Sequence, residues 1–495
     1  MEKQTISSCA TADSVTLYWE PLTDAPGKCF YRIFVDGCLE AQTQHTHYTM
    51  TGLQPGTGYG VEIRVGETVL GNCRAETTPR RRRLDVTGFG AVGDGKTMNT
   101  AAIQKAIDAC GGEEEVYIPA GIYCTGALRL HSNMALYLET GAVLQGSEDP
   151  DLYAPRIWSR FEGVEQECYQ SLLNLGTLDH GAGPNCRNVL IYGHGTISGG
   201  GRVLAEETIR RERQRLKEYL DRNADLVASC ENENTIPGRV RGRLVNMSNC
   251  EDVRITGLTL QNGASWNVHM VYSRNIITDH CVIRSAGIWN GDGWDPDSSE
   301  NCTLFGCRFA TEDDMVAIKS GKNPEGNWVN RPTRHIRIFD CSSAFGHGIA
   351  IGSEISGGVE DIKIWDCDIA RSSNGIEIKG TPKRGGYVRN VVVKDSTFPR
   401  LLIHSVLYND DGEPGPHPPR FSSCTFERLV LTGVRLEKEN TEEVRPIEIE
   451  GFDEPGYEAQ DLHIRDCVLC GPIHEVVVNN CAGISLENLT CKELL

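Results

Sequence analysis

The sequence lacks the features that direct a chain to a membrane or to nucleic acid. None of its apolar runs approaches the roughly 20 residues of a membrane-spanning helix. Residues 1–20 contain no basic segment followed by a continuous apolar one, so no signal peptide is visible and we expect a cytoplasmic protein. The formal net charge of −19 argues against nucleic acid and anionic membranes as partners, because both are bound by basic surfaces. An acidic substrate would need basic groups gathered locally against this overall charge.

The sequence also lacks the pattern of a disulfide scaffold and of a nucleotide site. Its 20 cysteines are spread over 495 residues, far too long a chain for a stapled mini-protein. Many of them recur at one place in the repeat described below, so we interpret them as small, reduced core residues. The glycine-rich segment 88–95 has neither the P-loop spacing nor the dinucleotide-binding spacing. We expect no cofactor and no metal.

The first 80 residues have the pattern of a small antiparallel β-sandwich. Apolar and polar residues alternate in segments 15–19, 31–35 and 59–65, and turn-forming residues lie between them. Segment 53–59 resembles the Leu-x-Pro-Gly-x-x-Tyr corner of fibronectin type III domains, and Trp19 lies in an early strand. We expect the basic run that ends at Arg83 to be a linker, with a fibronectin type III-like domain at 1–80 and a second domain at 81–495.

The second domain contains a repeat of short strands. Segments 275–281, 335–341, 361–367, 390–396 and 461–467 share one template that ends in Cys or Ser, and 301–307 is a variant. The template ends at positions 281, 307, 341, 367 and 396, which are 26, 34, 26 and 29 residues apart. Such units leave little room for crossover helices, which excludes a doubly wound sheet, and their unequal lengths argue against a propeller.

The repeat therefore predicts an all-β fold, a right-handed parallel β-helix preceded by the small antiparallel β-sandwich. Its coils would stack at the ~4.8 Å spacing of hydrogen-bonded strands, and the repeated Cys or Ser would form an internal ladder. The charged stretch 206–226 has near-helical spacing of apolar residues, so we expect it to be a helical insertion on the outside.

Three aspartates stand out between residues 289 and 321. Asp292, Asp313 and Asp314 each lie beside glycine or another acid, not beside a compensating Lys or Arg. Asp and Asn are common in turns, so this alone could be ordinary turn chemistry. However, Asp313 and Asp314 lie 6 and 7 residues after position 307, and His347 lies 6 after 341. Asp292 lies 11 residues after 281 and Lys379 lies 12 after 367.

These similar offsets predict that consecutive coils present the five side chains along one cleft. Carboxylates one or two strands apart come near the ~6.5–9.5 Å separation that accommodates a water in inverting glycoside hydrolysis. Crowded like charges also raise the proton affinity of one acid, as a general acid requires.

From about Val86 to the C-terminus, the chain resembles the family 28 glycoside hydrolases, the polygalacturonase family. The family motifs Asn-Thr-Asp, Asp-Asp, Gly-His-Gly and Arg-Ile-Lys correspond in order to residues 290–292, 313–314, 346–348 and 377–379. The resemblance implies inverting hydrolysis of α-1,4-galacturonosidic bonds in pectic oligosaccharides. It implies that Asp313 is the general acid, that Asp292 and Asp314 activate the water, and that His347 supports the acid pair.

The resemblance further implies that Lys379 holds a substrate carboxylate. Segment 201–240 and the added N-terminal module resemble the exo-acting branch of the family, in which extra loops close one end of the cleft. Gly291 replaces the motif threonine, which is a minor change. Glu377 replaces the motif arginine, and a carboxylate there would repel a galacturonate carboxylate. We expect another arginine to replace it or a different sugar to bind; the candidate substrate-binding residues are Lys379, Glu377, Arg239, Arg241, Arg243, Arg384 and Tyr408.

Three alternatives remain open. A pectate lyase would share the β-helix, but its calcium and proton-abstracting base are not provided by these motifs. A family 28 relative acting on rhamnogalacturonan or xylogalacturonan would account for Glu377. A non-enzymatic carbohydrate-binding β-helix would reduce the acids to turn residues.

Overall fold

The computed structural model describes residues 4–22, 27–437 and 440–492. The chain divides into two compact units, Met1–Arg83 and Leu84–Leu495, so the boundary lies three residues beyond the one predicted. Within the described ranges, no helix combines the length and the apolar character needed to cross a membrane.

The first unit consists of two antiparallel sheets. One has the order β1-β2-β5 and the other β4-β3-β6-β7. Trp19 and Tyr31 pack edge to face in the core, with ring centroids 5.3 Å apart. The hydroxyl of Tyr59 accepts a hydrogen bond from the backbone N–H of Gln54 at 3.0 Å, which is the corner that segment 53–59 predicts. The predicted sandwich is confirmed, and its assignment to the fibronectin type III domains stays a prediction. The strands are β1 (Ser7–Ala10), β2 (Ser14–Tyr18), β3 (Tyr31–Val35), β4 (Cys38–Thr43), β5 (His47–Thr51), β6 (Gly58–Val65) and β7 (Thr68–Glu76).

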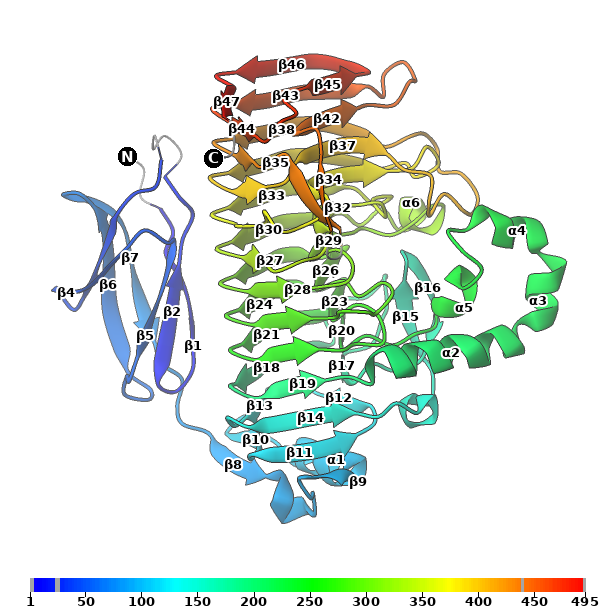
Figure 1. Ribbon diagram of the computed structural model, residues 1–495. Coiled ribbons are helices and arrows are strands. Elements are labelled where there is room, and N and C mark those ends of the chain that lie inside the picture. Colours follow the sequence, from blue (N-terminus) through cyan, green and yellow to red (C-terminus); the bar gives the residue numbers. More distant parts are fainter. Residues whose placement is uncertain (1–3, 23–26, 438–439, 493–495) are drawn as a thin grey trace. The chain divides into compact units, whose positions relative to one another are not determined.

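The second unit is a parallel β-helix, as predicted (Figure 1). Its thirteen-stranded sheet contains β8 (Arg82–Asp85), β10 (Glu114–Ile118), β13 (Met134–Leu138), β18 (Cys186–Gly193), β21 (Cys250–Thr256), β24 (Arg274–Asp279), β27 (Glu300–Phe305), β30 (Thr333–Phe339), β33 (Val359–Trp365), β35 (Tyr387–Lys394), β38 (Arg420–Glu427), β43 (Ala459–Arg465) and β46 (Cys481–Glu487). Its eleven-stranded sheet contains β12 (Leu128–Leu130), β17 (Leu173–Leu175), β20 (Val245–Ser248), β23 (Val268–Val271), β26 (Trp294–Asp297), β29 (Val316–Ile318), β32 (Gly348–Ile351), β34 (Gly375–Gly380), β37 (Leu401–Ser405), β42 (Ile447–Glu450) and β45 (Val476–Asn479).

The third side of each coil is formed by shorter strands. An eight-stranded sheet contains β9 (Asp94–Met98), β11 (Gly121–Thr125), β14 (Ala142–Gly146), β19 (Thr196–Ser198), β22 (Thr259–Gln261), β25 (Val282–Arg284), β28 (Arg308–Ala310) and β31 (Ser342–Ser343). A four-stranded sheet contains β36 (Thr397–Phe398), β39 (Val430–Leu431), β44 (Val468–Cys470) and β47 (Thr490–Lys492). Single β-bridges through Asp368 connect the two sheets, so this side also continues from coil to coil.

The repeated template has a structural explanation at both of its ends. The closing residues Cys281, Cys307, Cys341, Cys367 and Ser396 are all at most 3% exposed, and the N–H of Cys281 donates to Cys307 Sγ at 3.4 Å. This is the predicted internal ladder, and Cys281, Cys307, Cys341 and Cys367 in it form no disulfide. The opening residues have positive φ, for example +56° at Asn275 and +54° at Asp361. Asn and Asp adopt this left-handed conformation more readily than most residues, which explains their recurrence there.

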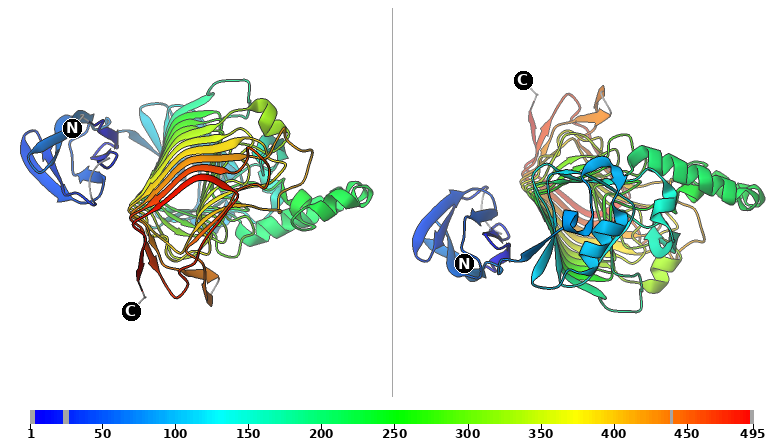
Figure 2. Two further views of the ribbon diagram at one scale, coloured as in Figure 1. Left: turned by 90° about the horizontal axis from the view of Figure 1, so that it is seen from above. Right: turned by 90° about the horizontal axis from the view of Figure 1, so that it is seen from below.

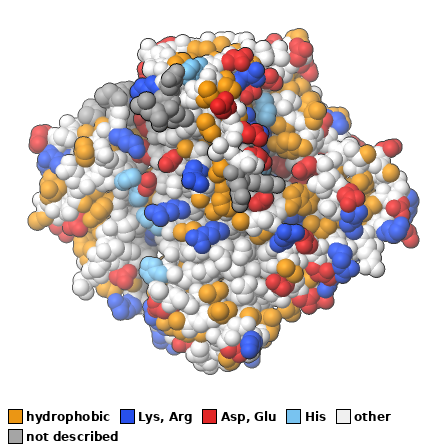
Figure 3. All heavy atoms as spheres, in the orientation of Figure 1, with side chains coloured by type: hydrophobic (Ala, Val, Ile, Leu, Met, Phe, Trp, Pro, Cys, Tyr) orange, Lys and Arg blue, Asp and Glu red, His pale blue; other side chains and the backbone are white. Residues whose placement is uncertain are grey.

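Several insertions leave the regular coils. An antiparallel hairpin is formed by β15 (Ile157–Phe161) and β16 (Val164–Cys168), and a smaller one by β40 (Val434–Glu437) and β41 (Asn440–Glu443). The helical insertion consists of α2 (Gly201–Arg215), α3 (Lys217–Arg222), α4 (Ala224–Ser229) and α5 (Thr235–Gly238), where the sequence predicts helix. Seen end on, the coils superpose and this insertion projects from their side (Figure 2). Acidic and basic side chains are interspersed over its surface, as in the Arg202–Glu206 and Lys217–Asp221 pairs (Figure 3). The remaining helices are η1 (Val86–Phe89), α1 (Thr100–Asp108), η2 (Pro150–Tyr153) and α6 (Glu325–Val329).

Candidate active site

The predicted catalytic residues lie together on the eleven-stranded sheet. Asp292 precedes β26, Asp313 and Asp314 precede β29, His347 precedes β32, and Lys379 belongs to β34. These strands are consecutive in the sheet, so the turns before them stack. The five residues line one cavity of about 240 Å³. The other lining residues are Glu162, Glu231, Trp266, Asn290, Lys319, Gly352, Ser353, Glu354, Asn374, Tyr408 and Asn409.

Each of the three carboxylates has its own cationic partner. Lys319 Nζ donates to Asp292 Oδ2 at 3.1 Å, and Lys379 Nζ donates to Asp314 Oδ2 at 3.2 Å. His347 Nδ1 lies 3.0 Å from Asp313 Oδ1. The acids have no adjacent Lys or Arg in the sequence, and their cationic partners come from other coils. Lys319 was missed, although it lies 12 residues after position 307, the same offset that Lys379 has from position 367.

Burial and mutual repulsion set the protonation of this cluster. Burial raises the pKa of Asp292 well above its ordinary value, and the neighbouring Asp313 and Asp314 add to this, while Lys319 opposes it. Burial likewise raises the pKa of Asp314, against the effect of Lys379. At Asp313 burial is outweighed by His347 and the two lysines, which hold the pKa below its usual range. Burial would lower the pKa of His347, but Asp313 raises it to about 9.

The proton of the Asp313–His347 pair therefore resides on the imidazole in the free protein. Burial and the neighbouring carboxylates raise the pKa of Asp292 and of Asp314. Asp313, the expected general acid, is instead ionised. Asp313 is also fixed by the backbone N–H of Asp314, which donates to its Oδ1 at 2.9 Å. The ligand atoms of Asp313, Asp314 and His347 all lie within 4.8 Å, close enough to share a metal ion. Because Lys379 already neutralises Asp314 and His347 shares a proton with Asp313, acid–base chemistry fits this set better.

Glu377 lies behind the cavity and not in its lining. Its side chain is 2% exposed, and its carboxylate lies 2.7 Å from His404 Nε2 and 3.1 Å from Lys379 Nζ. The carboxylate that we expected to repel a galacturonate is thus turned onto two basic neighbours behind the cavity. Tyr408 lies in the lining, with its ring centroid 5.8 Å from Lys379 Nζ.

The arginines expected to bind substrate do not reach the cavity. Arg241 is fully buried and donates to Asn290 Oδ1 at 2.5 Å, which supports a lining residue from behind. Arg384 is also fully buried and donates to the carbonyl of Asn409 at 2.7 Å. Arg243 is 2% exposed, and its guanidinium lies 5.5 Å from the centroid of the Trp266 ring. Arg241, Arg243 and Arg384 are thus buried outside the lining of this cavity, and their contact with substrate stays a prediction that the geometry does not support.

Buried cations nevertheless gather around this cavity, as an acidic substrate would require. In the described part of the chain, eight Lys and Arg side chains are buried, and five of them line the cavity or contact a lining residue. Only Lys319 and Lys379 reach the surface of the cavity. The other three lie behind the lining, and their positive charge contributes to the electrostatic potential in the cavity. The five are Lys319, Lys379, Arg241, Arg243 and Arg384.

Three insertions meet at the rim of the cavity. Arg239, which follows α5, pairs with Glu162 of the β15–β16 turn at 2.8 Å and with Asp411 of the loop after β37 at 2.9 Å. Lys322 also pairs with Asp411, and its backbone N–H donates to the carbonyl of Gly163 at 2.9 Å. Arg239 thus joins insertions and lies outside the lining of the cavity. Glu162, Glu231 and Asn409 line the cavity, so these segments bound it.

A parallel β-helix that gathers three carboxylates in a bounded cavity defines a carbohydrate-cleaving enzyme of the pectinase type. The family profile Glycosyl hydrolases family 28 matches residues 179–447, more than half of the chain, and the chain belongs to this family. A second profile, Rhamnogalacturonase A/epimerase, pectate lyase-like, matches residues 84–140.

Relatives and solved structures agree with this family. A probable polygalacturonase of Vitis vinifera is 34% identical over 343 residues, which cover 66% of this chain and 62% of that protein. An exo-poly-alpha-D-galacturonosidase of Dickeya chrysanthemi is 28% identical over 411 residues, covering 77% and 68%. A family 28 exopolygalacturonase of Yersinia enterocolitica has the same fold, with a TM-score of 0.84, 22% identity, and coverage of 99% of this chain and 95% of that one. An exopolygalacturonase of Thermotoga maritima is similar over 83% of this chain and 92% of that one, at 26% identity and a TM-score of 0.69.

Proposed function

We propose that this protein hydrolyses α-1,4-galacturonosidic bonds in pectic oligosaccharides from one chain end, with inversion at the anomeric carbon. The observation that carries this proposal is the set of three carboxylates, two buried and Asp313 half-buried, each paired with its own cation in one bounded cavity. Relatives named as polygalacturonases and exo-polygalacturonases support the substrate and the exo action.

In the proposed reaction, Asp313 protonates the oxygen of the departing sugar. His347 carries the proton in the free protein and returns it through Nδ1 to Asp313 when the substrate displaces water from the pair. The lysines favour the ionised forms of Asp292 and Asp314, and these ionised forms accept hydrogen bonds from the attacking water. The water adds to the anomeric carbon opposite the departing oxygen, one proton passes to a carboxylate, and no covalent intermediate forms.

The exo action is supported by the rim of the cavity. The contacts among Glu162, Arg239 and Asp411 join segments from three insertions beside the reacting groups. Cleavage in the middle of a polymer would require an open groove, in which these segments lie apart from one another. Lys379 and Tyr408 are the lining residues that we propose to contact the substrate carboxylate and ring.

The names of the relatives favour galacturonan over rhamnogalacturonan or xylogalacturonan. A binding protein without activity would not need each acid to be paired separately with a titratable or permanent cation. The predicted cytoplasmic location is not needed for the proposal and stays a prediction.

Product analysis on polygalacturonate and on defined oligogalacturonides tests the proposal. We expect reducing sugar to accumulate as one short product from the first minutes, while the viscosity of the polymer stays nearly constant. Asp313→Asn, purified in parallel, controls for contaminating pectinases. Random oligomers at early times would contradict exo action, and the absence of turnover in folded protein would contradict the proposed function.

A further inference from the structure

The two lysines of the active site occupy matching places in two similar three-residue arrangements. Lys319 lies between Asp292, at 3.1 Å, and Glu354, at 3.9 Å. Lys379 lies between Asp314, at 3.2 Å, and Glu377, at 3.1 Å. All six residues are at most 5% exposed. Each lysine therefore lies between one carboxylate of the reacting group and one glutamate.

The strand register produces this match. Ile318, Ile351 and Ile378 are paired neighbours on β29, β32 and β34, so the residues that follow them, Lys319, Gly352 and Lys379, occupy one row. Gly352 has φ +110°, and a Cβ there would lie 2.0 Å from the carbonyl oxygen of Lys379. No side chain therefore separates the two lysines, which are two strand spacings, roughly 10 Å, apart along the sheet.

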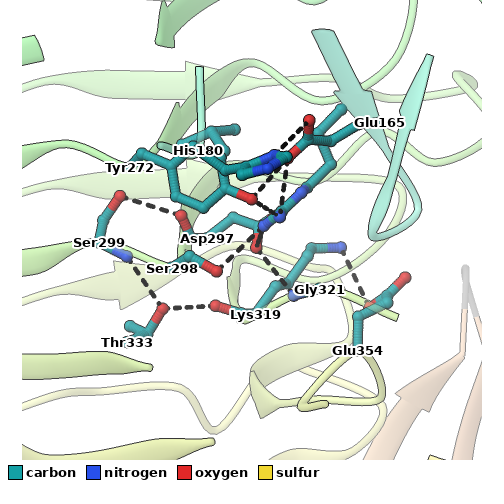
Figure 4. A network of polar contacts seen from close by, with 12 residues as sticks. Glu165, His180, Tyr272, Asp297, Ser298, Ser299, Lys319, Gly321, Thr333 and Glu354 are labelled. Atoms are coloured by element: carbon teal, nitrogen blue, oxygen red, sulfur yellow. Dashed lines mark hydrogen bonds and ion pairs between the residues drawn. The ribbon is translucent and has the colours of Figure 1, made fainter. Parts of the chain in front are cut away.

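The backbone of Lys319 is held firmly in this position. Its N–H donates to the carbonyl of Pro296 at 2.8 Å, and its carbonyl accepts from Thr333 Oγ1 at 2.5 Å. Figure 4 shows Lys319 held by Thr333, with its ammonium directed toward Glu354. The ammonium group of Lys319 also contacts an aromatic face, because its Nζ lies 4.1 Å from the centroid of the Trp266 ring. Such a locked side chain can set the geometry and ionisation of its partner.

We propose that Lys319 is a positioning residue that favours the anionic form of Asp292 and directs it at the attacking water, with Glu354 as its anchor. Lys379 and Glu377 do the same for Asp314, which explains why a glutamate occupies the position of the family arginine. The proposal rests on the proposed function, since it assigns the water-activating role to Asp292 and Asp314.

A substrate-binding role for Lys319 fits the charges less well. The titratable groups that face it are Asp292 from the turn before β26, Asp295 of β26, Asp314 from the turn before β29, and Glu354 after β32. These carboxylates outnumber the lysine, and of the two that pair with it, Asp292 is in the closer contact, at 3.1 Å. Asp292 in turn faces Asp313, Asp314 and Asp295, with Arg241 as a more distant cation. Lys319 is thus the cation in direct contact that opposes protonation of Asp292.

Lys319→Met, Lys319→Arg and Glu354→Gln test this role. We expect Lys319→Met to lower kcat by about 10²-fold with little change in KM, as for a loss felt mainly in the transition state. We also expect the acidic limb of its pH profile to move to higher pH, because Asp292 holds its proton more strongly. Lys319→Arg should restore most of the profile, and Glu354→Gln should have a smaller effect. Arg254→Met removes another buried cation, which pairs with Asp279 at 2.8 Å on the thirteen-stranded sheet, and should leave the profile unchanged.

A double-mutant cycle in thermal unfolding tests the same contact without substrate. In Lys319→Met the raised pKa of Asp292 means that stability is lost as pH rises through that pKa. The difference in melting temperature from the parent protein should therefore grow with pH, and it should lose this pH dependence when Asp292→Asn is added.

Three outcomes would overturn the proposal. They are a KM increase with unchanged kcat in Lys319→Met, an unshifted acidic limb, and a thermal cycle without pH-dependent coupling. If the parent protein does not hydrolyse galacturonan, the proposed function fails, and the thermal cycle still decides whether Lys319 controls Asp292.

Discussion

The outer faces of two sheets on the same coils use charge in opposite ways. On the thirteen-stranded sheet, Glu300 pairs with Arg334 at 2.7 Å, and both side chains are more than a quarter exposed. On the eleven-stranded sheet, Asp292 is 3% exposed, and one of its carboxylate oxygens is buried without a protein hydrogen-bond partner. Both carboxylate oxygens of Asp295 and one of Asp314 are likewise buried without a protein hydrogen-bond partner. Exposed pairs contribute little to stability, whereas buried and incompletely paired carboxylates are costly and mark a functional site.

The largest expected effect is the loss of activity when a carboxylate of the active site is neutralised, compared with a carboxylate on the thirteen-stranded sheet. Asp292→Asn, Asp313→Asn and Asp314→Asn should each lower kcat by roughly 10²–10⁴-fold, the usual contribution of one acid–base group. Glu300→Gln on the thirteen-stranded sheet is the matched control and should retain full activity. Steady-state kinetics on an oligogalacturonide, with circular dichroism to verify folding, measures both. Near-normal turnover by folded Asp313→Asn would remove that residue from the catalytic role.

Glu377 provides the next largest effect. Because its carboxylate anchors Lys379 and lies 2.7 Å from His404, Glu377→Arg should place like charges together behind the cavity. We expect kcat/KM to fall by about tenfold or more on every substrate, acidic or mixed. Competition between oligogalacturonide and a rhamnose-containing oligosaccharide measures this. A selective gain on oligogalacturonide would instead show that Glu377 sets specificity.

The pH profile should report the unequal pKa values of the cluster. Activity should rise as Asp292 and Asp314 ionise, with an acidic limb above the ordinary carboxyl range of ~4 because their pKa values are raised. It should fall again as the Asp313–His347 pair loses its proton, because the pKa of His347 is about 9. His347→Gln should move the alkaline limb to lower pH, since Asp313 then holds its proton alone. An alkaline limb that His347→Gln leaves in place would contradict proton storage on the imidazole.

Stability should change in opposite directions for two variants that both lose activity. Burial raises the pKa of Asp292, so its ionised form destabilises the protein as pH rises, and Asp292→Asn should raise the melting temperature at pH 8. The pKa of Asp313 is lowered by His347, so its ionised form stabilises the protein, and Asp313→Asn should lower the melting temperature. We expect shifts of about one or two degrees, corresponding to roughly 1–2 kcal/mol each in a unit of this size. Equal signs for the two variants would show that the electrostatic description of the cluster is wrong.

The smallest expected effect concerns the first unit. A truncated chain that begins at Leu84 should fold and keep most of its turnover, because the second unit has its own continuous core. Activity and melting temperature of the purified fragment measure this. An insoluble or inactive fragment would make the first unit part of the catalytic structure.

The repeat explains why so much of the site could be predicted from the sequence. A residue's offset from the buried Cys or Ser gives its place on the coil, so Asp292, Asp313, Asp314, His347 and Lys379 were brought together correctly. Lys319 has the same offset from a buried Cys as Lys379, so its place on the coil was also predictable. It was missed because its partner Asp292 lies on the preceding coil, 27 residues away in the sequence.

The insertions explain what was missed. Glu162, Glu231 and Asn409 line the cavity from segments that follow no repeat. The same segments cover Arg241 and Arg243, so a list of nearby arginines could not reveal that they support the cavity from behind. Whether a non-repeating segment covers an arginine depends on the tertiary structure, and a residue's offset within the repeat does not reveal it.

The configuration of the first product tests the account most directly. Proton NMR during hydrolysis of an oligogalacturonide by the parent protein should show the β-anomer at the newly formed reducing end before mutarotation. Inversion is required if Asp292 and Asp314 direct water at the anomeric carbon while Asp313 protonates the departing oxygen. Initial release of the α-anomer would demonstrate retention and contradict the proposed roles of all three carboxylates.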